Sequence, residues 1–488
     1  MSSTPDTVLR LLDAGAGDAT CINTPGGKPL TYGALRDLAA RTVATLNARG
    51  VGRGDRVAIV LDNGPEMAVA FLCISAGTTA APLNPAYRAD EFEFYLSDLN
   101  AKILIVAHDK ATPAIDVAEK LAIPIVRLKP TPEKGSGSFT LVFPDALKAR
   151  STRQPGPAAP DDIALVLHTS GTTSRPKIVP LAQQNICASA RNIRTTLALT
   201  AADRGLAIMP LFHIHGLMAS VLAPISAGSE VWCPGGFNAL KFFSWLAEVH
   251  PTWYTAVPTM HQTILARAGK NLDIVKANRL RFIRSSSSSL APQVIRELEE
   301  VFGAPVIESY GMTEAAHQMA SNPLPPAQRK PGTVGVPAGP EVCVIDTDGN
   351  PQPAGVPGEP PGGAEADPAV QRGVPLPQPG RVEQGDRSHW ADGGQLERDP
   401  AAEGVPGQVR GGDAEFGQQA GHGFGQGPRA GLGGRCQGGV AEAGQVDRDD
   451  VEVLGERGDD RVPGAAVQPD PVQQHERGAG ARAGVGKC

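Results

Sequence analysis

Helical and strand patterns alternate along the first third of the chain, and this alternation constrains the fold more than any other feature. Residues 31–50, TYGALRDLAARTVATLNARG, predict a helix with one apolar side, capped by Thr31 and ended by Gly50. A second helix is expected from Pro65 to about Ser75. Short apolar segments predict buried strands: DRVAIVL, KILIVAHD and IPIVRL. Strands that alternate with helices predict an α/β architecture with mainly parallel sheets.

The composition favours an enzyme of a reducing compartment, and a cytoplasmic location is expected. The 488 residues carry a net charge of −6, so no basic field favours nucleic acid or an anionic membrane. The seven cysteines are scattered, without the close pairs of zinc or redox sites. No basic region followed by an apolar run begins the chain, so no secretory signal is expected. The most apolar segment, residues 206–228, contains two histidines and two prolines, which predicts buried core or cleft wall rather than a membrane span.

Two segments break the α/β pattern. Residues 131–160 are rich in Pro, Gly, Ser and Lys and predict a surface connection. Residues 361–488 contain no Ile, Met, Thr, Tyr or Asn and hold 29 of the 57 glycines, so they cannot bury enough apolar surface to offset the entropy of ordering. We therefore expect a domain over residues 1–359 and a Gly/Pro/Arg-rich tail over residues 360–488. The tail is either a disordered extension or the product of a shifted reading frame, and RNA binding by its Gly/Arg pieces is opposed by its many acidic residues.

A loop rich in hydroxyls follows a buried strand in the middle of the chain. Residues 163–167, IALVL, predict the strand, and HTSGTTSRPKIVP follows directly. Gly171 allows a close backbone approach to an anion, successive N–H groups converge on it, and the hydroxyls add donors. Arg175 and Lys177 add positive charge. The segment is not a Walker A loop, because Pro176 precedes the lysine. The alternative interpretation is a polar surface turn.

Three motifs in the same order resemble those of the adenylate-forming enzymes, which include acyl-CoA synthetases, luciferases and peptide-synthetase adenylation domains. They are TSGTTSRPK, MPLFHIHG and ESYGMTEA. The family's loop usually carries Gly where Ser174 and Ile178 stand here. The resemblance implies a large domain with stacked, mainly parallel sheets flanked by helices. It also implies ATP, Mg²⁺ and CoA as cofactor and co-substrates.

The resemblance assigns roles to individual residues. Lys177, Thr313 and Glu314 are the implied catalytic residues, with Thr313 at the α-phosphate and Glu314 as the magnesium ligand. Tyr310 would stack on adenine, although an ordinary core aromatic is the alternative. The implied nucleotide-binding residues are Thr169, Ser170, Gly171, Thr172, Thr173, Ser287, Ser288, Ser289, Glu308, Ser309, Tyr310, Gly311 and Met312.

Four further segments resemble the oxalate–CoA ligase branch of this family: APLNPAYRADEFEFYLSDL, RSSSSSLAP, TEAAHQMASNPLPP and RKPGTVGVP. Oxalate has no hydrocarbon tail, so its site needs donors for a second carboxylate. His213, Ser286 and His317 are the expected substrate residues. A fatty acid would instead require an apolar tunnel, and another small acid remains an alternative. The alternative interpretation of His317 is a core histidine.

The implied reaction has two steps: a carboxylate oxygen attacks the α-phosphorus of ATP, and the CoA thiolate then attacks the resulting acyl-adenylate. The family's small C-terminal domain carries a catalytic lysine, and no such motif is found in residues 360–488. We therefore expect this chain to be impaired in turnover, and a nucleotide-binding remnant without turnover is the rival hypothesis. Loading of a carrier protein is a weaker alternative, and the oligomeric state stays open.

Overall fold

The strands of this protein assemble into two sheets. The computed structural model describes residues 4–169 and 176–343. Within these ranges, nine strands form the larger sheet in the order β16-β15-β14-β13-β12-β10-β11-β1-β2. The six strands from β14 to β1 in this order run parallel. At the two ends, β15 and β2 run antiparallel to them, and β16 pairs antiparallel with β15. The bounds of these strands are β1 Thr20–Asn23, β2 Leu30–Thr31, β10 Arg204–Leu206, β11 Glu230–Trp232, β12 Trp253–Ala256, β13 Phe282–Ser285, β14 Val306–Met312, β15 His317–Ser321 and β16 Val336–Pro337.

The smaller sheet has the strand order β7-β6-β5-β3-β4-β8-β9. Its five inner strands run parallel, and the edge strands β7 and β9 are antiparallel to their neighbours. The bounds of its strands are β3 Arg56–Val60, β4 Thr79–Pro82, β5 Ile103–Ala107, β6 Ile125–Pro130, β7 Phe139–Val142, β8 Ile163–Thr169 and β9 Lys177–Ala182.

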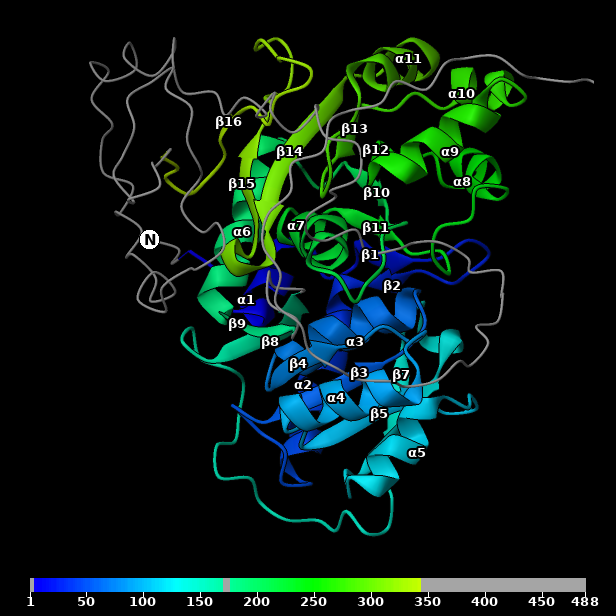
Figure 1. The fold of residues 1–488 in the computed structure, drawn as a ribbon. Coiled ribbons are helices and arrows are strands. Elements are labelled where there is room, and N and C mark those ends of the chain that lie inside the picture. Colours follow the sequence, from blue (N-terminus) through cyan, green and yellow to red (C-terminus); the bar gives the residue numbers. More distant parts are fainter. Residues whose placement is uncertain (1–3, 170–175, 344–488) are drawn as a thin grey trace, which may run out of the picture. The chain divides into compact units, whose positions relative to one another are not determined.

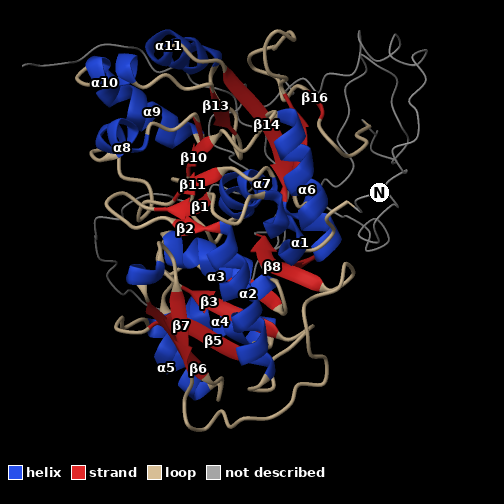
Figure 2. Cartoon of the chain, turned by 180° about the vertical axis from the view of Figure 1, so that it is seen from behind, coloured by secondary structure: helices blue, strands red, loops and turns tan. Residues whose placement is uncertain are grey.

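Helices cover both faces of both sheets (Figure 1). The core between the sheets contains residues of α1, α2, α3, α6 and a π-helix over Gly216–Leu222, and Figure 2 shows α2 and α3 between the two sets of strands. Helices α8 to α11 cover the outer face of the larger sheet, and α4 and α5 cover that of the smaller one. The bounds of the helices are α1 Val8–Leu11, α2 Tyr32–Asn47, α3 Pro65–Ser75, α4 Ala89–Leu99, α5 Pro113–Lys120, α6 Gln183–Thr196, α7 Ala223–Ser226, α8 Phe242–Val249, α9 Pro258–Ala268, α10 Leu272–Ala277 and α11 Pro292–Phe302, with 3-10 turns at Leu12–Ala14, Pro132–Lys134 and Thr313–Ala315.

The parallel strands are apolar at successive positions because each of their faces is buried in a different core. In β3, Val57 and Ile59 belong to the core between the sheets, whereas Ala58 and Val60 belong to the outer core under α4 and α5. A parallel sheet covered on both faces requires this continuous apolar run. The same alternation decides which side chains of each strand end can reach the space between the two sheets.

The expected fold class is confirmed for the described residues, down to several element bounds. The first expected helix is α2, which begins at Tyr32, and the Thr31 hydroxyl caps it by accepting a hydrogen bond from Ala34 N at 3.2 Å. The second is α3, which spans Pro65–Ser75. The three apolar segments form β3, β5 and β6.

The prediction that residues 131–160 are only a surface connection is wrong in part. Phe139–Val142 form the edge strand β7, which pairs antiparallel with β6 from Phe139 opposite Pro130 to Val142 opposite Arg127. Phe139 is buried and Thr140 is exposed, the alternation of an edge strand with one covered face. Residues 344–488, including the whole expected tail, lie outside the described residues.

The apolar segment 206–228 forms buried core, as its sequence predicts. It contains the end of β10, the π-helix and α7, and every residue of the π-helix is buried. None of the helices in the described ranges combines the length and the apolar character that a bilayer-spanning helix requires.

The carboxyl ends of the two parallel sheets meet. Thr169 is the last residue of β8 in the smaller sheet, and its hydroxyl donates a hydrogen bond to the carboxylate of Glu314, which follows β14 of the larger sheet, at 3.1 Å. Ligands of open parallel α/β sheets bind outside the carboxyl ends of the strands. This meeting point is therefore where the fold places a binding site.

Gln183 ties three helices together and gives a direct test of the core between the sheets. Its fully buried amide accepts from Val8 N of α1 at 2.9 Å and donates to the Ser75 carbonyl of α3 at 2.5 Å. A Gln183→Leu change leaves both backbone groups buried without partners. We therefore expect the free energy of unfolding, measured by urea denaturation, to fall by about 2–4 kcal/mol. Gln184→Leu is the matched control, because that exposed side chain contacts only Asp161 on the surface. Equal effects of the two changes would contradict this role of Gln183.

Candidate functional site

The hydroxyl-rich loop begins where β8 ends and returns as β9. Strands β8 and β9 pair antiparallel, with Thr169 opposite Lys177. The expected loop residues Ser170, Gly171, Thr172 and Thr173 lie outside the described residues, as do Ser174 and Arg175. Thr169 and Lys177 therefore mark the two ends of the loop, and the Lys177 side chain is exposed. The structure brings the start of this loop to Glu314 of the ESYGMTEA motif.

Strand β14 and the turn after it carry the second expected motif. Tyr310 is half-buried and pairs with Ala320 of β15, and a bulge follows between Tyr310 and Gly311. A Cβ atom on Gly311 would lie 1.6 Å from the carbonyl oxygen of His317, so only glycine permits this close approach of the two strands. Thr313 and Glu314 form a half-buried 3-10 turn directly after the strand. Burial, and then the charge of Glu314, raise the pKa of Tyr310, which keeps its phenol neutral.

Three of the expected site residues make hydrogen bonds inside the protein instead of pointing at open space. The carboxylate of Glu308 accepts a hydrogen bond from Gly332 N at 2.8 Å. The hydroxyl of Ser309 lies 3.0 Å from that of Ser321, and the hydroxyl of Ser286 donates to the Ser309 carbonyl at 2.9 Å. All three side chains are buried. In this structure they hold β13, β14 and β15 together.

The serines after β13 are presented differently. Ser287, Ser288 and Ser289 are exposed, and Ser287 has a φ of 74°, which is rare for a residue with a side chain. Its hydroxyl oxygen lies 2.9 Å from Nδ1 of His215, which precedes the π-helix. The strained backbone thus places one serine hydroxyl against a buried histidine while its residue remains exposed.

A buried cluster of one arginine and two histidines lies behind these serines. The guanidinium of Arg284, on β13, contacts Nε2 of His215 and Nε2 of His317, each at 3.2 Å. It also donates to the hydroxyl of Thr255 at 3.3 Å and to the amide oxygen of Gln318 at 3.4 Å. The two imidazole rings stack with their centroids 5.0 Å apart. Arg284 is fully buried, and its Nε has no hydrogen-bond partner among the described residues.

The electrostatics of this cluster leave one positive charge and two neutral rings. Burial lowers the pKa of His215 well below its usual range, and His317 and Arg284 lower it further. Burial, and then Arg284, also hold the pKa of His317 well below its usual range. Burial lowers the pKa of Arg284 to about 9, which still leaves the guanidinium charged at neutral pH. Within the described ranges no carboxylate pairs with that charge.

His213, the third expected substrate residue, lies at the edge of this cluster. It is half-buried, and its ring centroid lies 4.5 Å from that of Phe212. Burial lowers the pKa of His213 to about 4, so the imidazole is neutral above that pH. Its proximity contributes to the lowered pKa of His215.

The sequence reasoning missed Arg284 and His215 as site residues. Arg284 is a charged residue that directly follows the apolar positions Phe282 and Ile283 of a buried strand, and a fully buried arginine is rare without a partner. A charged residue at this position of an apolar strand is a sequence signal by which Arg284 could have been found. His215 is two residues after His213 in MPLFHIHG, and nothing in the sequence distinguishes the roles of the two histidines.

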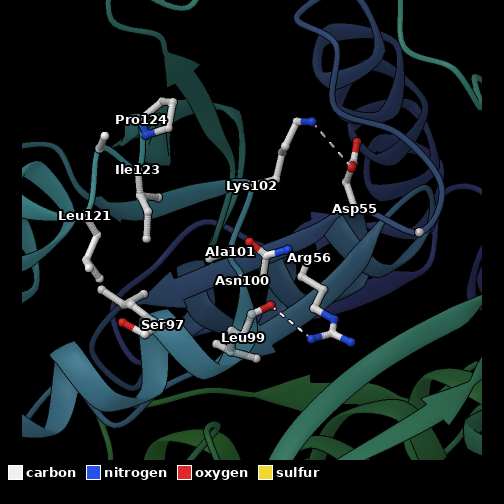
Figure 3. A pocket seen from close by; sticks show the side chains of 13 residues that line it. Asp55, Arg56, Ser97, Leu99, Asn100, Ala101, Lys102, Leu121, Ile123 and Pro124 are labelled. Atoms are coloured by element: carbon white, nitrogen blue, oxygen red, sulfur yellow. Dashed lines mark hydrogen bonds and ion pairs between the residues drawn. The ribbon is translucent and has the colours of Figure 1, made fainter.

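A pocket elsewhere in the described part does not belong to this site. A cavity of about 660 Å³ lies at the start of β3 and β5 and before β6, the amino ends of these strands. Figure 3 shows the side chains that line it. Its charges have protein partners: Lys102 lies 3.8 Å from Asp55, and Arg56 donates to the Leu99 carbonyl at 3.0 Å. It offers no unpaired charge comparable to that of Arg284.

No group of three or more His, Cys, Asp or Glu side chains in the described ranges is placed to hold a metal ion on its own. The single carboxylate of Glu314 beside the Thr169 hydroxyl is compatible with Mg²⁺, which usually binds one or two carboxylates together with water and substrate phosphates.

Comparison with known proteins agrees with this arrangement. The family model described as AMP-binding enzyme matches residues 13–359. The chain is 43% identical over 352 residues to an oxalate–CoA ligase of Arabidopsis thaliana, covering 70% of this chain and 68% of that protein. It is 40% identical over 331 residues to an oxalate–CoA ligase of Saccharomyces cerevisiae, covering 63% of this chain and 60% of that protein. The chain thus spans about two thirds of the length of the curated relatives it matches.

A solved structure shares the fold. ATP-bound MatB from Rhodopseudomonas palustris superimposes with a TM-score of 0.62 at 27% identity, covering 72% of this chain and 69% of that one. The residues that match the family model include β8, β14 and the turn with Thr313 and Glu314. This chain belongs to the AMP-binding enzyme family, and within that family to the acyl-CoA synthetases.

Proposed function

We propose that this chain is an ATP-dependent ligase that joins oxalate to CoA, with another small acid or a short- or medium-chain carboxylate as the alternative substrate. The observation that carries the proposal is the buried charge of Arg284, which contacts two neutral histidines and has no carboxylate partner among the described residues. A buried charge without a counter-ion is unfavourable, and an anionic ligand supplies what it lacks. The relatives named as oxalate–CoA ligases support the same substrate.

Oxalate suits this site because its two carboxylates have separate tasks. One carboxylate attacks ATP, and the other needs hydrogen-bond donors in place of the apolar tunnel that a fatty acid requires. The candidate donors are the imidazoles of His213 and His317 and the hydroxyl of Ser287, which is exposed and contacts His215. Ser286, expected as a donor, gives its proton to the Ser309 carbonyl, so Ser287 is the better candidate.

The proposed nucleotide site lies where the two sheets meet. Thr169, the residues that follow it and Lys177 would contact the β- and γ-phosphates that leave as pyrophosphate, and Thr313 would contact the α-phosphate. Fixed hydroxyl and N–H donors stabilise the charge that develops on phosphate oxygens during transfer. Tyr310 would stack on adenine. When bound, Mg²⁺ would neutralise part of the phosphate charge, and Glu314 with the Thr169 hydroxyl is the group that would hold it.

The proposed reaction forms and breaks one bond to phosphorus and then one to carbon. A substrate carboxylate oxygen bonds to the α-phosphorus of ATP as the bond to pyrophosphate breaks, which gives oxalyl-adenylate. The CoA sulfur then bonds to the activated carbonyl carbon as AMP leaves and the thiol proton is lost. We assign this chemistry to the domain over residues 1–359. The rival hypothesis, a nucleotide-binding remnant without turnover, shares the first site but lacks both steps.

The nucleotide assignment predicts that Tyr310→Ala weakens ATP binding to the 488-residue chain. Aromatic stacking on a base contributes about 1–3 kcal/mol, so calorimetry should show a loss of roughly 5- to 150-fold in affinity. Tyr310→Phe is the matched control, because it keeps the ring and should bind ATP nearly as the unchanged chain does. Equal affinities for the Ala variant and the unchanged chain would remove Tyr310 from the site.

The substrate assignment predicts that pyrophosphate release, although slowed in a chain that we expect to be impaired, is faster with oxalate than with acetate or octanoate. His317→Ala should lower kcat/KM for oxalate by on the order of 10² more than for acetate, because only oxalate has a second carboxylate that loses a donor. His261→Gln is the control, since His261 is equally buried but contacts the Tyr254 hydroxyl at 3.3 Å and the backbone of Arg284, and not its guanidinium.

Two outcomes would count against the substrate assignment. Equal losses for oxalate and acetate in His317→Ala would show that the histidine has only a structural role. ATP binding without pyrophosphate release, for oxalate and for every other small acid, would favour the remnant hypothesis.

A further inference from the structure

We propose that Arg284 is a positioning residue that fixes the protons of His215 and His317 on Nδ1 and thereby turns the site into a set of hydrogen-bond donors for a carboxylate. The proposal concerns hydrogen-bond direction, and it rests on the proposed function only for the identity of the carboxylate. Arg284 itself is fully buried behind the two histidines. It therefore acts through them and not by contact with the substrate.

The proton of His215 is placed by two donors that face its Nε2. A guanidinium has only N–H donors, and Nη1 of Arg284 lies 3.2 Å from this nitrogen. The Thr255 hydroxyl lies 2.7 Å from the same nitrogen and 3.3 Å from Nη1 of Arg284. Thr255 can satisfy both contacts by accepting from the arginine and donating to the histidine. Nε2 of His215 is thus an acceptor, and the ring proton is on Nδ1.

The same reasoning places the proton of His317. Nη2 of Arg284 lies 3.2 Å from Nε2 of His317 and 3.4 Å from the amide oxygen of Gln318. The orientation of that amide is fixed, because its nitrogen donates to the Thr196 hydroxyl at 3.1 Å and to the Ala338 carbonyl at 3.2 Å. Nε2 of His317 therefore accepts, and a neutral ring carries its proton on Nδ1.

Double protonation of either ring is opposed by its surroundings. A second ring proton would sit on Nε2 and face the N–H groups of Arg284. Burial already lowers the pKa of both histidines well below the usual range, with the charge of Arg284 acting in the same direction. The two histidines are thus neutral, and the guanidinium sets their tautomer.

Through His215, Arg284 also determines which partner donates in the hydrogen bond to the exposed residue Ser287. The Nδ1–H of His215 donates to the Ser287 hydroxyl oxygen at 2.9 Å. An oxygen that accepts this bond keeps its own proton free to donate to another group. The φ of 74° at Ser287 holds the hydroxyl in this place. The series from Arg284 to His215 to Ser287 therefore presents an O–H donor, the polarity that a carboxylate requires.

Loss of Arg284 would release this constraint. With the proton of His215 on Nε2, the bare Nδ1 would accept the proton of Ser287, and the serine would turn its lone pairs toward the incoming carboxylate. A donor would become a repulsive acceptor at an unchanged position. The effect is specific to substrates with a second carboxylate.

The tautomers can be read directly by nuclear magnetic resonance on the 488-residue chain labelled with ¹⁵N-histidine. Long-range ¹H–¹⁵N spectra distinguish Nδ1–H from Nε2–H rings, and His215→Gln and His317→Gln identify the two signals. We expect Nδ1–H for both rings in the unchanged chain and a shift toward Nε2–H for at least one ring in Arg284→Met. Arg281→Met is the matched control, because Arg281 precedes the same strand but pairs with Asp203.

Two results would overturn the proposal. One is an Nε2–H tautomer at either histidine in the unchanged chain, which decides the question even if Arg284→Met does not fold. The other is a folded Arg284→Met variant in which both rings keep Nδ1–H.

A kinetic measurement separates this proposal from the proposed function. Arg284→Met should lower kcat/KM for oxalate by on the order of 10² more than for acetate, whereas Arg281→Met should leave the ratio of the two acids unchanged. Failure of the unchanged chain to use oxalate contradicts the proposed function and leaves the tautomer result standing. Parallel losses for both acids in Arg284→Met would contradict the positioning role.

Discussion

The site depends on a guanidinium that is buried with neutral partners. Arg284 makes hydrogen bonds to two imidazoles, a hydroxyl and an amide, and none of these carries a negative charge. Hydrogen bonds of this kind offset part of the desolvation of a cation, but a counter-ion offsets much more. The described part of the protein therefore contains an electrostatic imbalance that the proposed anionic substrate would correct. A long apolar acid would bury the same charge without correcting it.

The two sheets bring this cation to the site by simple geometry. Side chains of a strand alternate between faces, so Arg284, two residues after Phe282, shares the face that packs between the sheets. The π-helix that follows His215 lies in that same layer. Because the parallel strands end along one edge, the cluster of Arg284, His215 and His317 lies toward the edge where Thr169 meets Glu314. The proposed acid site and the proposed nucleotide site thus lie along one edge.

The sequence predicted the elements whose signals are local. The cap of α2 at Thr31 and the start of α3 at Pro65 follow from residue type and position alone, and both are confirmed. The edge strand β7 was missed because its four residues lie among loop-forming ones. Arg284 and His215 were missed for a different reason: their importance arises from a contact between distant segments, and no local pattern contains it. The motifs predict where the proposed site lies, but the direction of its hydrogen bonds needed the structure.

The backbone around the cluster of Arg284, His215 and His317 gives a reason why the proposed site should discriminate between substrates. Ser287, Ala316 and His317 all have positive φ values, of 74°, 53° and 99°. Each such conformation costs on the order of 1–3 kcal/mol and persists only where the surrounding structure enforces it. Here Gly311 lies against the His317 carbonyl, and β14 and β15 are paired on both sides of that contact. If the proposed function is right, donors held by paired strands cannot follow a ligand that binds in a different place, so an acid lacking the second carboxylate would leave them unpaired. The strained backbone thus supports the proposed selectivity for a substrate with two carboxylates.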